Sequence, residues 1–191
     1  MAAHLIRRAF VALMAAGMVA GCANPPSHLP PPDFVPEPAA VTRVFLLRHA
    51  EKEAGADPAL TGSGMARAVQ LAERLRGEGV TAIWSTATRR AQDTAAPLAA
   101  VLGLEVATYD AGDLPTFAAG LMETPGVIVV VGHSNTTDVL AGLVGADPGP
   151  PIDDAAEFDR LYVISLGEDG VLRARIERYG ARSAAAAGGP P

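Results

Sequence analysis

The sequence predicts an α/β fold, a three-layer α/β/α sandwich built on a mostly parallel central sheet. Short unbroken runs of apolar residues recur along the chain, the clearest being Val127–Val131, and such runs are typical of strands covered on both faces. Segments with apolar residues at helical spacing lie between these runs. Aromatic residues make up only 5% of the chain, so an alanine-rich α/β domain fits the composition better than a β-sandwich.

The expected elements follow one another through the middle of the chain. Apolar runs predict three buried strands, over 41–47, 80–84 and 127–131. Helical spacing predicts three helices, over 61–76, 88–102 and 136–144. Thr61 or Ser63 can cap the first helix, and Gly145 can end the last one. Two more apolar runs on either side of Gly167–Gly170 predict a closing hairpin over 161–166 and 171–176.

The first forty residues predict a targeting signal followed by a tether. Arg7 and Arg8 precede an apolar run that is too short to span a bilayer comfortably, which is typical of a secretory leader. The run ends in Val19-Ala20-Gly21-Cys22, which resembles a bacterial lipobox. That resemblance implies cleavage before Cys22 and a lipid on its thiol, and Ala23 favours the outer membrane facing the periplasm in a Gram-negative cell. The alternative is a short buried helix with a chance cysteine.

These patterns divide the chain into four parts. We expect a lipoprotein signal peptide over 1–21, an acylated Cys22 with a proline-rich tether over 22–40, a folded domain over 41–180 and a disordered tail over 181–191. Cys22 is the only cysteine, so no intramolecular disulfide can form. The net charge of −6, which becomes −8 when Arg7 and Arg8 leave with the leader, argues against nucleic acid as a partner. We expect a monomer held at a membrane through the lipid.

The domain contains two histidines, and each lies one residue beyond an apolar strand. His49 follows the first expected strand, and His133 follows Val127–Val131 by one residue. Because ligands of open α/β sheets bind beyond the carboxyl ends of the strands, both imidazoles would project into one cleft if the strands are neighbours. Residues 134–136 can cap the next helix, whose N-terminus favours an anion there. The alternative is that both histidines stand at strand ends by chance.

Two arginines add positive charge to the same place. Arg48 directly precedes His49, and Arg89 and Arg90 begin the second expected helix. With Ala91 and the apolar residues after it facing the core, the helical spacing turns Arg89 to solvent and places Arg90 at the edge of the packed face. We therefore assign Arg90 to the cleft. Arg48, Arg90 and the two imidazoles predict a localised site for a phosphate dianion.

At these residues the chain resembles the histidine phosphatase superfamily, which has a phosphoglycerate-mutase-like fold. The segment 47–52 (LRHAEK) matches the R-H-[GA] signature, 90–94 (RAQDT) matches an R-A-x-x-T element, and 132–135 (GHSN) matches the element of the second histidine. Weaker matches are found over 60–68 and 157–161. The matches occur in the family's order over about residues 43–178.

This resemblance implies a phosphatase that acts on phosphate monoesters or phosphohistidine through a covalent phosphohistidine on His49. Arg48, Arg90 and His133 would bind the phosphoryl oxygens, with Asn135 also at the substrate, and neither a metal nor another cofactor is implied. Many relatives carry a carboxylate after the third strand of their fold as general acid, and the corresponding region here is 104–113. Here Asp110 or Asp113 could serve, and Asp110 is the preferred candidate, although either can be a helix cap or a surface residue. Glu51 and Lys52 can lie at the rim of the pocket or form a solvated pair.

Three other functions stay open at this point. A mutase would have to shield the phosphoenzyme from water, and the short chain offers no obvious lid. A non-catalytic envelope lipoprotein that binds a phosphorylated ligand would not need all four pocket residues. A zinc hydrolase built on His49, His133 and a carboxylate is disfavoured because the adjacent arginines would repel the cation.

Overall fold

The computed structural model describes residues 40–183 of the 191-residue chain. The predicted leader, Cys22, the tether up to residue 39 and the tail from residue 184 lie outside the described residues. Residues 181–183, which the sequence assigns to the tail, contact the domain. The carbonyl oxygen of Ala181 accepts a hydrogen bond from Arg67 Nη1 (2.9 Å), and Ser183 Oγ accepts one from the backbone nitrogen of Phe158 (2.8 Å).

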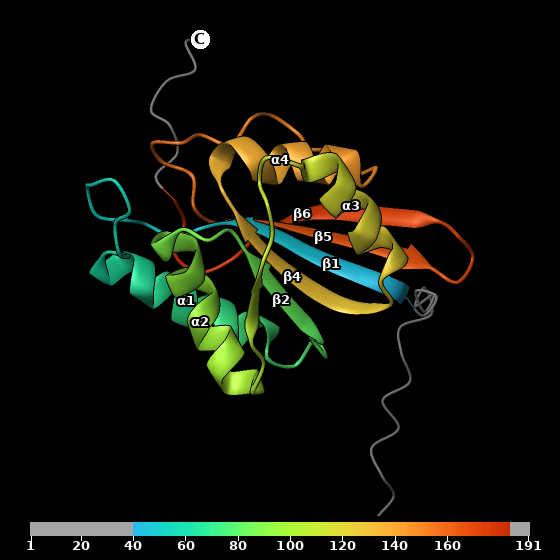
Figure 1. Cartoon of the computed structure of the whole chain (residues 1–191), viewed down its shortest axis with the longest axis horizontal. Helices are drawn as coiled ribbons and strands as arrows, with labels where there is room; N and C mark the ends of the chain where they lie inside the picture. The colour runs from blue at the N-terminus through green and yellow to red at the C-terminus, as the bar shows by residue number, and fades with distance from the viewer. Residues whose placement is uncertain (1–39, 184–191) are drawn as a thin grey trace, which may run out of the picture. The chain divides into compact units, whose positions relative to one another are not determined.

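A six-stranded sheet with the strand order β3-β2-β4-β1-β5-β6 forms the middle layer (Figure 1). Strands β1 to β4 pair in parallel, and β5 pairs antiparallel with both β1 and β6. The α/β fold is therefore confirmed, with a mixed sheet. In chain order the elements are β1 (Ala40–Arg48), α1 (Gly62–Leu75), β2 (Ala82–Ser85), α2 (Arg89–Leu102), β3 (Val106–Thr108), α3 (Leu114–Glu123), β4 (Gly126–Gly132), α4 (Ser134–Leu143), β5 (Arg160–Gly167) and β6 (Leu172–Arg178).

Helices cover both faces of the sheet, with α1 and α2 on one face and α3 and α4 on the other (Figure 1). Successive side chains of a strand point to opposite faces, so the apolar run of β1 serves both layers. Phe45 and Leu47 pack towards α1 and α2, whereas Val44 and Leu46 pack towards α3 and α4, and all four are buried. This double burial is the reason that the central strands are apolar without alternation.

The register between β1 and β4 determines where the functional residues meet. Arg48 at the end of β1 lies opposite Gly132 at the end of β4. The next residue of each strand is a histidine, and the backbone nitrogen of His49 donates to the carbonyl oxygen of Gly132 (2.9 Å). The two histidines therefore leave the same edge of the sheet side by side. Within residues 40–183, no helix has the length and apolar character needed to cross a membrane.

Candidate active site

Two imidazoles lie together at the carboxyl ends of β1 and β4. The ring centroids of His49 and His133 are 5.3 Å apart, and the ring planes are inclined by 65°. His49 is 3% exposed, while His133 is half-buried as the N-cap residue of α4. The structure thus brings the two histidines into one site, as their positions after neighbouring strands require.

Hydrogen bonds fix the orientation of the His49 ring. Its Nδ1 lies 2.8 Å from the carbonyl oxygen of Ala50, which can only accept, so Nδ1 carries the proton and Nε2 keeps its lone pair. The backbone around the ring is held as well, because Ala50 N donates to Thr94 Oγ1 (3.0 Å) and Thr94 Oγ1 donates to the carbonyl oxygen of Arg90 (2.7 Å). Thr94 in the R-A-x-x-T segment therefore couples the start of α2 to the residue after His49.

The partners of His133 also define its tautomer. Arg90 Nη2 lies 3.3 Å from His133 Nδ1, and because a guanidinium can only donate, Nδ1 must accept. The proton of the neutral ring is then on Nε2, which lies 2.9 Å from Thr86 Oγ1 and can donate to it. Thr86 follows β2, so three strand ends contribute to the site.

Arg48 packs into the wall of the site and holds the loop before β5. Its side chain is 3% exposed and its guanidinium carbon lies 4.2 Å from the centroid of the Phe158 ring. Nη1 donates to the carbonyl oxygens of Asp153 and Glu157 (both 3.1 Å), and Nη2 donates to the carbonyl oxygen of Asp154 (2.8 Å). The Nε of Arg48 is buried and has no hydrogen-bond partner among the described residues.

The two arginines at the start of α2 differ as the helical spacing requires. The Arg90 side chain is 19% exposed and reaches His133, whereas the Arg89 side chain is 62% exposed and lies 3.5 Å from Asp93 on its own helix. Arg90 Nε, like that of Arg48, is buried without a hydrogen-bond partner in the described part of the chain. A buried N–H donor without a partner is costly, and two of them beside the imidazoles are suited to an anion.

The surroundings keep both imidazoles neutral. Burial lowers the pKa of His49 to about 4, and the charges of Arg48 and Arg90 act in the same direction against the hydrogen bond to Ala50. Burial also lowers the pKa of His133 to about 4, with Arg90 and Arg48 adding to the shift and the charge of Asp154 opposing it. A neutral imidazole is the form that can act as a nucleophile at near-neutral pH.

The three remaining candidates of the domain, Asp110, Asp113 and Asn135, are exposed. Asp110 is exposed in the loop between β3 and α3, and its carboxylate accepts from the backbone nitrogen of Gly112 (2.8 Å). Asp113 caps α3 by accepting from Thr116 N (3.3 Å). Asn135 is exposed in the first turn of α4, next to His133. None of the recorded hydrogen bonds of residues 40–183 joins Asp110 to either imidazole.

Sequence reasoning missed the carboxylates that do lie beside the site. Asp154 Oδ1 accepts from Arg48 Nη2 (2.8 Å) and from Ser134 Oγ (2.5 Å). Asp57 Oδ1 accepts from the backbone nitrogen of Arg89 (2.8 Å) and lies 4.0 Å from Arg90 Nη1. Both aspartates are in loops whose sequence carries no periodic pattern, so only their contacts reveal them.

Residues of the weaker match over 60–68 hold the loop after β1 in place. Arg67 donates through Nε and Nη2 to the Glu51 carboxylate (2.8–3.0 Å) and through Nη1 to the carbonyl oxygens of Tyr179 and Ala181. Gly64 of the same helix approaches the Glu51 backbone so closely that an added Cβ would lie 2.0 Å from the Glu51 carbonyl oxygen. Glu51 is thus a structural anchor, paired with Arg67 rather than with Lys52.

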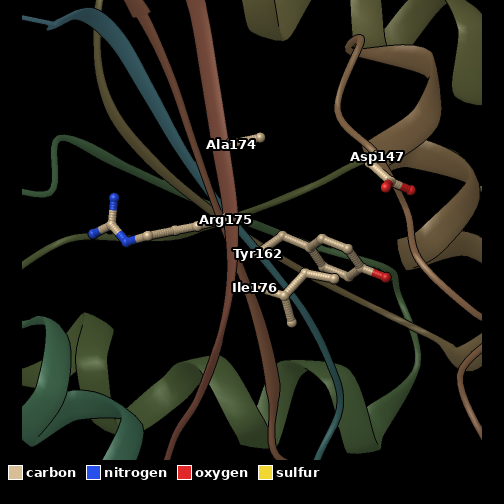
Figure 2. Close-up of a pocket in the computed structure, with 5 residues that line it drawn as sticks. All are labelled: Asp147, Tyr162, Ala174, Arg175 and Ile176. Atoms are coloured by element: carbon tan, nitrogen blue, oxygen red, sulfur yellow. The ribbon is translucent and has the colours of Figure 1, made fainter.

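A separate hollow lies beside the outer strand β6, lined by Asp147, Tyr162, Ala174, Arg175 and Ile176 (Figure 2). Figure 2 shows Tyr162 and Ile176 on the side of β6 that faces Asp147, while the Arg175 side chain extends to the other side. The guanidinium of Arg175 therefore points away from Asp147. Within residues 40–183, no three His, Cys, Asp or Glu side chains gather into a group that could hold a metal ion.

Residues 44–111 match the family model of the histidine phosphatase superfamily (branch 1). The matched segment runs from β1 to the loop after β3 and includes Arg48, His49 and Arg90, while His133 lies beyond it. Among curated proteins, no sequence matches the chain.

Solved structures with the same fold include several phosphatases. The protein histidine phosphatase SixA complexed with tungstate is similar with a TM-score of 0.59 and 19% identity, covering 72% of this chain and 97% of that one. A mycobacterial glucosyl-3-phosphoglycerate phosphatase with inorganic phosphate has a TM-score of 0.55 and 19% identity (74% and 98% covered). A phosphoserine phosphatase of Entamoeba histolytica in complex with 3-phosphoglyceric acid has a TM-score of 0.52 and 15% identity (73% and 97% covered). At these identities the likeness concerns the fold, and it confirms the phosphoglycerate-mutase-like architecture.

Proposed function

From the histidine phosphatase superfamily pattern in residues 44–111, we propose that this chain is a metal-independent phosphatase that hydrolyses phosphate monoesters or phosphohistidine through a phosphohistidine on His49. The observation that carries the proposal is the pair of neutral imidazoles 5.3 Å apart, His49 buried and His133 half-buried, flanked by Arg48 and Arg90. The similar solved structures, which are named as phosphatases of phosphohistidine, phosphoserine and a phosphoglycerate derivative, support the same class of substrate.

The attacking atom is His49 Nε2. The hydrogen bond from Nδ1 to the Ala50 carbonyl oxygen leaves the Nε2 lone pair unprotonated and directs it into the site. In the first half-reaction this lone pair forms a P–N bond while the bond from phosphorus to the leaving oxygen breaks. In the second half-reaction water attacks phosphorus, the P–N bond breaks, and inorganic phosphate leaves with the histidine neutral again.

Arg48, Arg90 and His133 surround the transferring group. The unpartnered Nε–H groups of Arg48 and Arg90 donate to phosphoryl oxygens, and the guanidinium charges stabilise the negative charge spread over those oxygens in the transition state. When substrate binds, the neutral His133 exchanges its Nε2–H bond to Thr86 for one to a phosphoryl oxygen, and Asn135 lies in the first turn of α4 to contact the rest of the substrate. Two fixed cations supply the charge that a metal supplies elsewhere, so no metal takes part in the proposed steps.

The proposal also includes the location of the protein in the cell. Cleavage before Cys22 and acylation of its thiol would hold the phosphatase at a membrane of the cell envelope, facing the periplasm if the cell is Gram-negative. Its substrates would then be small phosphorylated compounds outside the cytoplasm.

The test is phosphate release from para-nitrophenyl phosphate in the presence of EDTA. We expect the wild-type chain to be active and His49→Asn to lose on the order of a thousand-fold in kcat/KM. His28→Asn, in the predicted tether, serves as the matched control and should keep wild-type activity. Trapping with radioactive substrate and rapid denaturation should label the wild-type chain and leave His49→Asn unlabelled.

Other results would refute the proposal in different ways. Full activity in His49→Asn would eliminate the assigned nucleophile. Binding of phosphorylated ligands without turnover would indicate the non-catalytic alternative, and transfer of the phosphoryl group to a sugar acid instead of water would indicate a mutase. Loss of activity in EDTA with restoration by zinc would overturn metal independence.

A further inference from the structure

A proton donor for the leaving group is still missing from the proposed reaction. When the bond between phosphorus and an alkyl or phenyl oxygen breaks, the departing oxygen needs a proton to avoid leaving as a strong base. His49 is the nucleophile, His133 is hydrogen-bonded to Thr86 and Arg90, and guanidinium groups do not give up protons. A carboxyl group at the rim of the site is suited to supply this proton to a phosphate monoester.

The turn that contains Asp154 is fixed to the site by Arg48. The Arg48 guanidinium donates to three backbone carbonyl oxygens between Asp153 and Glu157. Hydrogen bonds within the turn add to this, because Glu157 N donates to the Asp153 carbonyl oxygen (2.9 Å) and Ala155 N donates to Asp153 Oδ1 (2.8 Å). The same side chain that flanks the nucleophile thus also positions this loop.

The Asp154 carboxylate has one anchored oxygen and one free oxygen. Oδ1 accepts from Arg48 Nη2 and Ser134 Oγ, so it is held between the residue before His49 and the residue after His133. Oδ2 has no recorded hydrogen bond in the part of the chain that the structure describes, and the side chain is 80% exposed. One carboxylate oxygen is thus oriented by the catalytic elements, while the other can exchange a proton.

The other carboxylates near the site are less suited to this role. Asp110 turns its carboxylate back to the backbone of its own loop at Gly112. Asp57 accepts from the backbone nitrogen at the start of α2 and lies on the Arg90 side. Of the three, Asp154 is the one that is hydrogen-bonded to neighbours of both histidines, to Arg48 before His49 and to Ser134 after His133.

On the premise that the chain is a phosphatase, we propose that Asp154 is the general acid and base of the reaction. In the first half-reaction the protonated Asp154 gives its proton to the leaving oxygen as the P–O bond breaks and the P–N bond to His49 forms. In the second half-reaction the Asp154 carboxylate takes a proton from the attacking water as the new P–O bond forms and the P–N bond breaks. Asp154 is then protonated again for the next cycle.

The charges around Asp154 change in the direction that this role needs. In the free enzyme the hydrogen bond from Ser134 lowers the pKa of Asp154, with the positive charges of Arg48 and Lys52 acting in the same direction against burial. A phosphate dianion bound at Arg48 and Arg90 places negative charge next to this carboxyl and offsets those cations. Its pKa therefore rises when substrate binds, which favours the protonated form before the first step.

Leaving-group dependence separates a proton donor from a residue that only positions Arg48. We expect Asp154→Asn to lower kcat/KM for phenyl phosphate by about a hundred-fold or more, the range of general acid catalysis. For 2,4-dinitrophenyl phosphate, whose phenol leaves without a proton, the loss should be less than about five-fold. Glu105→Gln is the matched control, because Glu105 is exposed before β3, at the opposite end of that strand from Asp110, and should match the wild type with both substrates.

A second measurement keeps the test independent of folding. Inorganic phosphate should inhibit Asp154→Asn as strongly as it inhibits the wild type or more strongly, because one negative charge near the anion site is removed. Equal losses with both substrates, or weaker inhibition by phosphate, would show that Asp154 acts only through Arg48. A selective loss in Asp110→Asn or Asp57→Asn, with Asp154→Asn unaffected, would move the role to that residue. A wild type that hydrolyses neither ester would overturn the proposed function itself.

Discussion

Two glycines in the first turn of α1 provide a paired test of how the loop after His49 is supported. Gly62 is exposed and an added Cβ would meet no atom within 4 Å, whereas Gly64 is buried with its Cβ position 2.0 Å from the Glu51 carbonyl oxygen. Both substitutions to alanine remove the same backbone freedom, a gain of up to about 1 kcal/mol in a helix interior. The difference between the two variants therefore isolates the contact with Glu51.

The overlap at Gly64 cannot be relieved by a side-chain rotation. Real Cβ atoms stay at least 3.0 Å from such an atom, so the helix and the Glu51 backbone would have to separate by about 1 Å. The Glu51 carbonyl oxygen also accepts from Thr61 N (3.0 Å), and that hydrogen bond would be strained. Overpacking of this kind costs about 1–3 kcal/mol, so Gly64→Ala should be less stable than Gly62→Ala by that amount.

Urea unfolding followed by circular dichroism measures this difference directly. We expect Gly62→Ala to unfold at or slightly above the wild-type midpoint and Gly64→Ala to unfold clearly below it, with similar slopes. In a thermal scan each kcal/mol corresponds to about 2–4 °C for a domain of this size. Equal midpoints for the two alanine variants would falsify the close approach of α1 to Glu51 and with it the reason for a glycine at this position.

Three further predictions concern the candidate active site and the attachment of the protein to a membrane. Arg90→Ala should lower kcat/KM about a hundred-fold or more. Arg89→Ala should keep kcat/KM within about two-fold of the wild type, because the Arg89 side chain points to solvent. The reverse ranking in the same phosphatase assay would contradict the orientation of α2 that turns Arg90 towards the site. In the folded chain the pKa values of His49 and His133 are both about 4, below the ordinary value of 6.5. As the pH drops from about 6.5 to 4, these histidines bind protons in the unfolded chain but not in the folded one, so the free energy of unfolding should fall over this range. That loss is about 1.4 kcal/mol per pH unit for each histidine at most, and His49→Asn should show a shallower decline in urea titrations at pH 7, 5.5 and 4.5. Finally, Cys22→Ser should move the protein from the membrane pellet to the soluble fraction, and unchanged fractionation would refute the lipid anchor.

The sequence alone determined the class of fold and the residues at the strand ends. The doubly buried strands required unbroken apolar runs, and those runs are visible without any structure. Because His49 and His133 each follow such a run, their meeting depended only on the two strands being neighbours. The assignment of Arg90 rather than Arg89 to the site came from helical spacing in the same way. The short strand β3 and helix α3 were not predicted, since three strand residues and a ten-residue apolar helix give little periodic signal.

Only the tertiary structure decided what surrounds the two imidazoles. Asp154, Thr86 and Phe158 reach the site from loops, where no spacing rule relates a residue to its direction. Arg48 could be placed at the site from its neighbour in sequence, but its hold on the loop 153–157 required contacts between residues more than a hundred positions apart. Strand order and register bring such residues together, and these depend on packing of the whole domain rather than on any local pattern.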